Sequence, residues 1–320
     1  MKRLLAFLIA GWAAMAATAK AADALVGRVE VRPIASQTLS DAQFLRGEEG
    51  KPVTVAGELR IPDAPGRLPA VVLIHGSGGP GANIPMWESE FNHMGIATFA
   101  LDGFTGRGIV QTSTDQAQLG RLNLILDAYG ALAQLAKHPR IDPNRIVLMG
   151  FSRGGQATLY ASLTRFNKLW NKSGAAFAAY IPFYPDCMTH YIDDDKTAAP
   201  IRMFHGQPDD YNPAAPCTEF MGRLKAAGAD VTQTIYPDAA HGFDAPNSDA
   251  PVQAAKSQTV RACRIREETP GVLIDTATGQ PFAYTDACVQ LGPHVGGNAK
   301  ARAQSIEAVE AFVSALFEKK

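Results

Sequence analysis

A serine in a glycine-rich turn is the residue best suited to chemistry in this sequence. Ser152 lies in the hexapeptide Gly150-Phe-Ser-Arg-Gly-Gly155, between an apolar segment at 145–149 and a helix-like segment at 156–163. The order strand, G-x-S-x-G, helix is typical of a nucleophile elbow, a tight turn that exposes a serine hydroxyl at the carboxyl edge of a sheet. Small residues on both sides of the serine leave space for that turn. We therefore expect Ser152 to be an activated nucleophile.

An activated serine needs a base, normally histidine, and a carboxylate that orients the base. In folds with a nucleophile elbow, the chain order is serine, then Asp or Glu, then histidine. The loop after an expected strand at 201–205 supplies Asp209 as the first choice of acid and Asp210 as the second. His241 is the preferred base because it directly follows the last expected strand, and His294 is the other histidine after the acid. The aspartate that does not orient the base is expected to cap the next helix.

Backbone N–H groups must also stabilise the negative charge that develops on the carbonyl oxygen under attack. One donor is expected to be the N–H of Arg153, the residue directly after the serine. The second is expected in the glycine-rich loop that follows an apolar strand at 69–75, with Ser77 as the first choice and Gly78 as the alternative. Glycines in this loop allow the backbone to approach the substrate closely.

The same loop fits a second pattern, that of a dinucleotide-binding turn. Gly76, Gly78 and Gly81 form G-x-G-x-x-G, and Asp102 follows about 20 residues later, where an acid that binds the ribose would stand. Pro80 restricts the start of the helix that would hold the pyrophosphate, and two further strands precede this unit. This alternative, an NAD(P)-binding oxidoreductase, also leaves the serine, aspartate and histidine unexplained, so we regard it as remote.

With these residues identified, the sequence resembles the dienelactone hydrolase family of α/β-hydrolases. The resemblance implies a serine hydrolase that cleaves ester bonds, with Ser152, Asp209 and His241 as its catalytic triad and with no metal or organic cofactor. It extends over about 69–244 together with the last helix. The matching segments are 72–76, 102–108, 150–155, 204–209 and 241–244.

Two departures limit what the resemblance implies about the substrate. Dienelactone hydrolases proper use cysteine as the nucleophile, whereas position 152 is serine. They are also cytosolic and compact, whereas this chain has the features of an exported protein with an insertion. We therefore expect hydrolysis of small-molecule carboxylic esters, or lactones, through an acyl-enzyme. A peptidase or an acyltransferase would use the same attack chemistry and differ only in the acceptor, and a non-catalytic binding protein is a more remote alternative.

Arg107 has two interpretations. It lies in the segment 102–108 at the expected mouth of the site, where it could bind a substrate carboxylate. The simpler interpretation, which we prefer, is a structural turn in which Arg107 pairs with Asp102.

The elements that position these residues alternate between strands and helices, which predicts a parallel sheet with right-handed crossovers. Two antiparallel edge strands are expected first, at 26–33 and 53–61. Further strands are expected at 69–75, 95–101, 145–149, 177–183, 201–205 and 230–236, and helices at 84–94, 115–137, 156–163, 217–227 and 305–317. The prediction is a single domain over 22–320 with the α/β-hydrolase fold, a mostly parallel sheet flanked by helices.

An irregular insertion is expected at about 243–298, before the last helix. The four cysteines are even in number, which in an oxidising compartment indicates two disulfides. Of the three possible pairings we prefer the one that keeps each bridge within one region of the fold. It joins Cys187 to Cys217 and Cys263 to Cys288, so that the second bridge closes part of the insertion.

The first residues indicate export. Lys2 and Arg3 precede an apolar stretch at 4–17, and Ala19-Lys-Ala21 is a suitable cleavage site, so we predict a signal peptide at 1–21 and a periplasmic or secreted protein. The remaining sequence has no other long apolar segment, and no membrane association is expected after cleavage. The net charge of −1 lacks the basic excess of nucleic-acid-binding proteins. The sequence does not indicate an oligomeric state.

Overall fold

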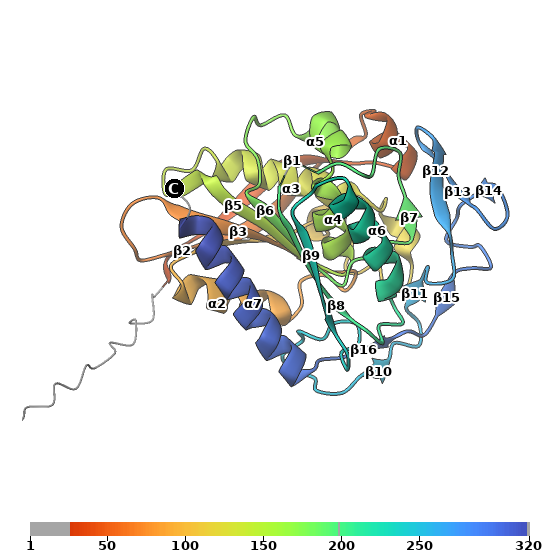
Figure 1. Cartoon of the computed structure of the whole chain (residues 1–320). Helices are drawn as coiled ribbons and strands as arrows, with labels where there is room; N and C mark the ends of the chain where they lie inside the picture. The colour runs from red at the N-terminus through yellow and green to blue at the C-terminus, as the bar shows by residue number, and fades with distance from the viewer. Residues whose placement is uncertain (1–25, 198, 319–320) are drawn as a thin grey trace, which may run out of the picture.

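The computed structural model describes residues 26–197 and 199–318 (Figure 1). Its centre is an eight-stranded sheet in the order β1-β2-β4-β3-β5-β6-β8-β9. β2 runs antiparallel to its neighbours β1 and β4, and the remaining neighbours are parallel, which confirms the predicted fold class. The strands are β1 (Val26–Thr38), β2 (Lys51–Pro62), β3 (Leu68–Ile74), β4 (Ala97–Asp102), β5 (Ile141–Phe151), β6 (Ala179–Phe183), β8 (Ile201–Gly206) and β9 (Val231–Tyr236).

Helices cover both faces of the sheet because successive side chains of the buried strands point to opposite faces. Val71 and Leu73 of β3 enter one apolar core together with residues of α2 and α7, whereas Val72 and Ile74 enter a second core with residues of α3 and α4. Figure 1 shows α2 and α7 together on one side of the sheet. The helices are α1 (Asp41–Arg46), α2 (Asn83–His93), α3 (Asn123–Leu135), α4 (Arg153–Ala161), α5 (Thr164–Trp170), α6 (Ala214–Ala226), α7 (Ala299–Glu318) and the 3-10 turns η1 (Thr105–Arg107) and η2 (Gln116–Gln118).

The helix expected over 115–137 is divided into the turn η2 and helix α3. The backbone between them is bound to the end of β1 and the start of α1. The Asp41 carboxylate accepts the Arg121 N–H at 2.6 Å, and the Asn123 side chain exchanges two hydrogen bonds with the backbone of Leu39, each 2.8 Å long. These contacts replace bonds that a continuous helix would make. The hydrophobic periodicity of the sequence gives no indication of these contacts.

The insertion is more regular than expected. Strands β12, β13 and β14 form a four-stranded sheet with β7 (Thr189–His190), a strand from outside the insertion, at the right of Figure 1. Glu267 on β12 is buried against Arg165 of α5, with 2.8 Å between Oε1 and Nη2. A buried charge of this kind obscures the alternation that would mark a strand. The strands of this region are β10 (Val252–Gln253), β11 (Gln258–Thr259), β12 (Ile265–Thr269), β13 (Val272–Asp275), β14 (Gln280–Pro281), β15 (Gln290–Leu291) and β16 (His294–Val295).

The expected signal peptide, 1–21, lies outside the described residues. Within the part of the chain that the structure describes, each helix is too short or too polar to cross a lipid bilayer.

Candidate active site

Ser152 occupies the turn between β5 and α4, as predicted. Its backbone has φ 55° and ψ −113°, a conformation that non-glycine residues rarely adopt and that is found at strained functional turns. A Cβ atom at Gly154 would lie closer than 3.0 Å to the backbone of Ile74 on β3. The first turn of α4 therefore packs directly against the neighbouring strand, and only glycine fits there.

The fold brings Ser152, His241 and Asp209 into one hydrogen-bonded chain. Ser152 Oγ lies 2.8 Å from His241 Nε2, and His241 Nδ1 lies 2.8 Å from Asp209 Oδ2. Asp209 follows β8 and His241 follows β9, so the carboxyl ends of adjacent parallel strands supply both residues. The distances suit transfer of a proton from the hydroxyl to the imidazole.

Asp209 is held as an ion in a buried place. Its Oδ1 accepts the N–H groups of Tyr211 and Asn212, at 2.9 and 2.8 Å. Burial by itself would raise the pKa of Asp209, but the charge of His241 and hydrogen bonds from His205 and His241 hold it well below its usual range. The carboxylate can therefore orient the imidazole without taking its proton.

The alternative acid and the alternative base pair with each other instead. Asp210 accepts the backbone N–H of His294 at 2.7 Å, and its Oδ2 lies 2.9 Å from His294 Nδ1 and 3.0 Å from Arg261 Nη1. This cluster is partly exposed. The expectation that the second aspartate caps the next helix is wrong, because Asp210 binds the insertion and α6 begins after Pro213 without a side-chain cap.

The glycine-rich loop after β3 lies against the serine. A Cβ atom at Gly76 would be 3.2 Å from Ser152 Cβ, which places the loop backbone in contact with the elbow. The Gly76 carbonyl accepts the N–H of Gly79 at 3.1 Å, and the Ser77 carbonyl accepts the N–H of Thr112 at 2.7 Å. Among the described residues, the backbone N–H of Ser77 has no hydrogen-bond partner.

His75 supports this loop, a role that the sequence did not indicate. Its Nε2 accepts the N–H of Gly103 at 3.2 Å, which leaves Nδ1–H to donate to the Gly76 carbonyl at 2.8 Å. Burial lowers the pKa of His75 and keeps the ring neutral, as this arrangement requires. The carbonyl of Gly76 is thereby held in place, and with it the next peptide N–H, that of Ser77.

Two tyrosines enclose the imidazole of His241. The ring of Tyr211 stacks on it at 4.6 Å, and the ring of Tyr184 meets it edge-on at 4.7 Å, measured between centroids. Tyr184 has a positive φ of 36° and donates its hydroxyl proton to buried Asp244. Asp244 also accepts the indole N–H of Trp87 at 3.0 Å. Sequence reasoning missed these aromatic residues, since nothing distinguishes them locally from core residues.

Arg107 lies outside the site, in the turn η1, and has the structural role that we preferred, but its partner is Asp127 and not Asp102. Its guanidinium forms a two-point ion pair with Asp127, at 2.6 and 2.9 Å, and both side chains are buried. Asp102, the expected partner, instead accepts the N–H groups of Phe104 and Thr105. With its donors occupied, Arg107 has no free group for a substrate carboxylate.

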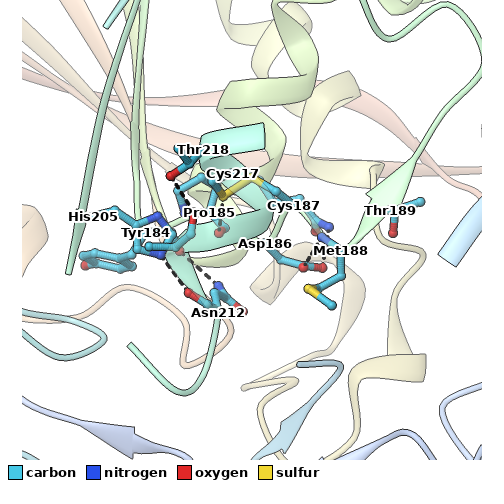
Figure 2. The surroundings of a disulfide bond; sticks show 12 residues. Tyr184, Pro185, Asp186, Cys187, Met188, Thr189, His205, Asn212, Cys217 and Thr218 are labelled. Atoms are coloured by element: carbon cyan, nitrogen blue, oxygen red, sulfur yellow. Dashed lines mark hydrogen bonds between the residues drawn. A yellow bond between two sulfur atoms is a disulfide. The ribbon is translucent and has the colours of Figure 1, made fainter. Parts of the chain in front are cut away.

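Both preferred disulfides are present, Cys187–Cys217 and Cys263–Cys288. Figure 2 shows the surroundings of the first: Cys187 directly follows Asp186, and the Asn212 side chain donates to the Tyr184 carbonyl, at 3.0 Å, close to the bridge. The bridge therefore links the loop after β6 to helix α6.

Two cavities meet at Ser152. The first is small, about 30 Å³, and is lined mostly by polar side chains. The second is an open cleft with more apolar walls, on the side of the histidine. The polar cavity is lined by Ser77, Gln116, Arg121, Arg153, Gln156 and Asp186, among others, and the cleft by Gly76, Tyr184, His241, Ala245, Ala254 and Val295, among others. Among residues 26–197 and 199–318, no cluster of His, Cys, Asp or Glu side chains is arranged to hold a metal ion.

The amino-acid sequence and the fold were compared with those of known proteins. A model of the dienelactone hydrolase family matches residues 55–264. A putative carboxymethylenebutenolidase from Methylorubrum extorquens is 25% identical over 242 residues, which cover 67% of this chain and 79% of that protein. Acyl-protein thioesterase 1 from Gibberella zeae is 36% identical over 107 residues, which cover 32% of this chain and 43% of the thioesterase, less than half of its length.

A solved structure shares the fold. The crystal structure of a dienelactone hydrolase-like promiscuous phosphotriesterase from metagenomic libraries aligns with a TM-score of 0.57 at 17% identity, over 91% of this chain and 99% of that one. Since the family model covers more than half of the chain, the chain belongs to the dienelactone hydrolase family, and in class it is an ester-bond hydrolase.

Proposed function

We propose that this protein is an exported serine hydrolase that cleaves small carboxylic esters or lactones through an acyl-enzyme. The observation that supports this most is the hydrogen-bonded chain from Ser152 through His241 to Asp209, with both distances at 2.8 Å. One relative is named as a butenolidase and another as a thioesterase. Lactone, ester and thioester hydrolysis all transfer an acyl group to water, so one set of residues would serve each.

The proposed reaction has two halves. His241 Nε2 takes the proton of Ser152 as Oγ forms a bond to the carbonyl carbon, and the N–H groups of Arg153 and Ser77 stabilise the oxyanion. The C–O bond to the alcohol then breaks, and the alcohol leaves with the proton from His241. In the second half, His241 deprotonates water, which attacks the acyl-enzyme and releases the acid, returning the proton to Oγ. Asp209 remains ionised throughout.

The proposed export accounts for the oxidised cysteines. Disulfides persist in the periplasm and outside the cell and are rare in the cytosol. The two bridges suit such a compartment.

Substitution of the serine tests the proposal. With p-nitrophenyl acetate as substrate, we expect Ser152→Ala and His241→Ala each to lower kcat by at least about a thousandfold, because either change removes the activated nucleophile. His294→Ala is the matched control, since His294 pairs with Asp210 away from the serine, and its kcat should stay within about twofold of wild type. A fluorophosphonate probe should label wild type and not Ser152→Ala. Unchanged turnover by Ser152→Ala would refute the proposal.

A further inference from the structure

The open cleft beside Ser152 is the space in which the two sides of an ester would lie. Its volume is about 320 Å³, roughly that of ten water molecules, whereas the polar cavity, at about 30 Å³, holds roughly one. His241, which must reach the leaving alcohol, also lines the cleft. The acyl group and the alcohol therefore both contact the walls of the cleft.

Apolar side chains form much of these walls. Phe151 directly precedes the serine, and Ala245, Ala254 and Val295 come from the insertion. A parallel β-bridge between Val295 and His241 holds this part of the insertion beside the imidazole. The cleft is thus a surface on which apolar groups of a substrate are removed from water, which favours their binding.

The carboxyl group in the wall already has its hydrogen-bond partners. Asp244 is buried and accepts the indole N–H of Trp87 at 3.0 Å, the amide of Asn83 at 3.1 Å and the hydroxyl proton of Tyr184. These donors come from the protein itself. Asp244 therefore needs no donor from a substrate, and its oxygens would repel a substrate carboxylate.

The wall lacks positive charge. Within the part of the chain that the structure describes, neither Arg nor Lys lines the cleft. Arg121 and Arg153 line the polar cavity instead, and both interact electrostatically with the carboxylate of Asp41. Asp209, which is held as an ion, lies 2.8 Å from the imidazole that borders the cleft. A carboxylate in the cleft would meet this negative charge and find no counter-ion.

Two cations close to lining residues along the chain do not change this balance. Arg302 donates to the carbonyl of Ala245 at 2.7 Å, and its other terminal nitrogen lies 3.5 Å from Asp249. Lys256 belongs to the turn that follows Ala254, where it is exposed. Because both lie outside the lining, a carboxylate that entered the cleft would lose hydration without gaining an ion pair.

Exposed valines extend the apolar surface beyond the cleft. Val252 is 61% exposed and lies opposite Val295 in an antiparallel pair, so the two side chains stand on the same face. Val110 is 86% exposed, and its carbonyl lies 3.0 Å from where a Cβ atom of Gly79, in the glycine-rich loop, would be. Apolar side chains from two separate segments thus adjoin the residues that line the cleft.

We propose that the open cleft selects uncharged, apolar esters and excludes esters that carry a carboxylate on either the acyl or the alcohol side. The proposal rests on the esterase function proposed above and specifies its substrate class. The absence of a cation from the lining excludes the charge, and the apolar walls favour the hydrocarbon.

Two pairs of esters with matched shape test the exclusion of charge. Monoethyl succinate and ethyl 4-methylpentanoate carry a carboxylate and an isopropyl group at the end of the acyl chain. Acetoxyacetate and isobutyl acetate carry the same two groups on the alcohol side. With wild-type protein in a pH-stat at neutral pH, kcat/KM relative to the rate constant for hydroxide-catalysed hydrolysis should favour the isopropyl ester at least about tenfold in each pair.

A series of uncharged ethyl esters tests the apolar contact. From ethyl acetate through ethyl propionate to ethyl butyrate, the same relative kcat/KM should rise about twofold to fourfold with each methylene, because each one is removed from water against the walls of the cleft. A flat or falling series would contradict an apolar acyl site.

Two arginine variants locate the effect. Ala254→Arg places a guanidinium at the wall of the cleft, where it can pair with a carboxylate, and should raise the ratio of carboxylate to isopropyl ester at least about tenfold in one or both pairs. Ala255→Arg is the matched control, because it adds the same charge at an exposed position outside the lining. It should keep the wild-type ratios.

Each outcome decides the proposal. Equal or faster hydrolysis of the carboxylate esters by wild type would overturn it, as would equal ratios in the Ala254→Arg and Ala255→Arg variants. The wild-type comparison decides even if Ala254→Arg does not fold. Hydrolysis of p-nitrophenyl acetate separates the two proposals: Ser152-dependent turnover without discrimination against charge removes only the substrate class, whereas no turnover removes the esterase function.

Discussion

Adjacent aspartates in the loop after β8 have opposite surroundings. Asp209 is buried, accepts two backbone N–H groups and contacts His241. Asp210 is partly exposed and binds His294 and Arg261 of the insertion. An aspartate thus orients the base at position 209, whereas the aspartate at position 210 holds the insertion against the rest of the protein.

Substitution by asparagine should separate these two roles. Asp209→Asn keeps the shape but offers an amide to His241, which disturbs the tautomer and removes the charge that stabilises the imidazolium. We expect kcat for p-nitrophenyl acetate to fall by about 10³ to 10⁴. In Asp210→Asn, a partly exposed ion pair is lost, and kcat should stay within about twofold of wild type, with at most about 1 kcal/mol lost in stability. Similar losses of kcat in the two variants would contradict the assignment of the acid.

The same depressed pKa makes Asp209 a contributor to stability whose effect depends on pH. Its pKa in the fold lies below its value in the unfolded chain. The ionised carboxylate therefore stabilises the fold fully above an unfolded pKa of about 3.9, and that contribution is lost as the pH falls toward the folded value.

At the scale of elements, the ends of β8 and β9 must lie very close for acid and base to meet. Gly206 ends β8 and leads to Asp209, and the carbonyl of Ala239, two residues before His241, lies where a Cβ atom of residue 206 would be. The two loops that provide Asp209 and His241 are thus in backbone contact, and a side chain between them would push them apart.

Alanine at Gly206 should therefore disturb both stability and activity. The added methyl group would lie closer than 3.0 Å to backbone atoms that cannot rotate away. We expect a loss of about 1 to 3 kcal/mol in the free energy of unfolding in urea and a fall in kcat. Gly222→Ala is the matched control, because Gly222 lies in α6 with no heavy atom within 4 Å of its added Cβ. That change should raise stability by about 0.5 to 1 kcal/mol and leave kcat unchanged. A Gly206→Ala variant with wild-type kcat would show that the contact does not position the two loops.

Sequence patterns predicted the buried strands well, because strands covered on both faces consist of continuous apolar runs such as 69–75. Short helices such as α5 and the strand β12 were not predicted, since charged residues inside them, among them Glu267, break the hydrophobic pattern. The partner of Arg107 was missed for a different reason: Asp127 lies 20 residues away along the chain, on helix α3, and only the fold brings the two side chains together.

The site was predictable to the extent that chain order constrains it. The order of serine, aspartate and histidine selects loops that the fold brings together, and the elbow is recognisable by its glycines. Side chains that support the site by packing against it could not be identified from the order of residues along the chain. Tyr184 and Tyr211 contact His241 only because three separate strand ends converge. The surroundings of Arg121 likewise depend on the insertion, which places Phe282 over its guanidinium.

At the scale of the whole molecule, each disulfide supports a different part of the site. Cys187 follows Asp186, which holds Arg121 and Gln156 in the polar cavity, and its partner Cys217 lies on α6 (Figure 2). The Cys263–Cys288 bridge closes the part of the insertion that roofs the cavity. The sequence separations, 30 and 25 residues, are similar, so the chain-entropy contribution to stability should be similar as well.

Removing the bridges one at a time should therefore give equal losses of stability and unequal losses of activity. By chain entropy, the double serine variant of either pair should lose about 3 to 4 kcal/mol in the free energy of unfolding. For p-nitrophenyl acetate, kcat/KM should fall several-fold in the Cys187→Ser, Cys217→Ser variant, because that bridge holds the loop after β6 beside the site. It should stay near wild type in the Cys263→Ser, Cys288→Ser variant, because that bridge lies within the insertion. Steady-state kinetics with this substrate and urea unfolding under non-reducing conditions measure these effects. If the second variant lost as much activity as the first, the insertion would support the triad itself.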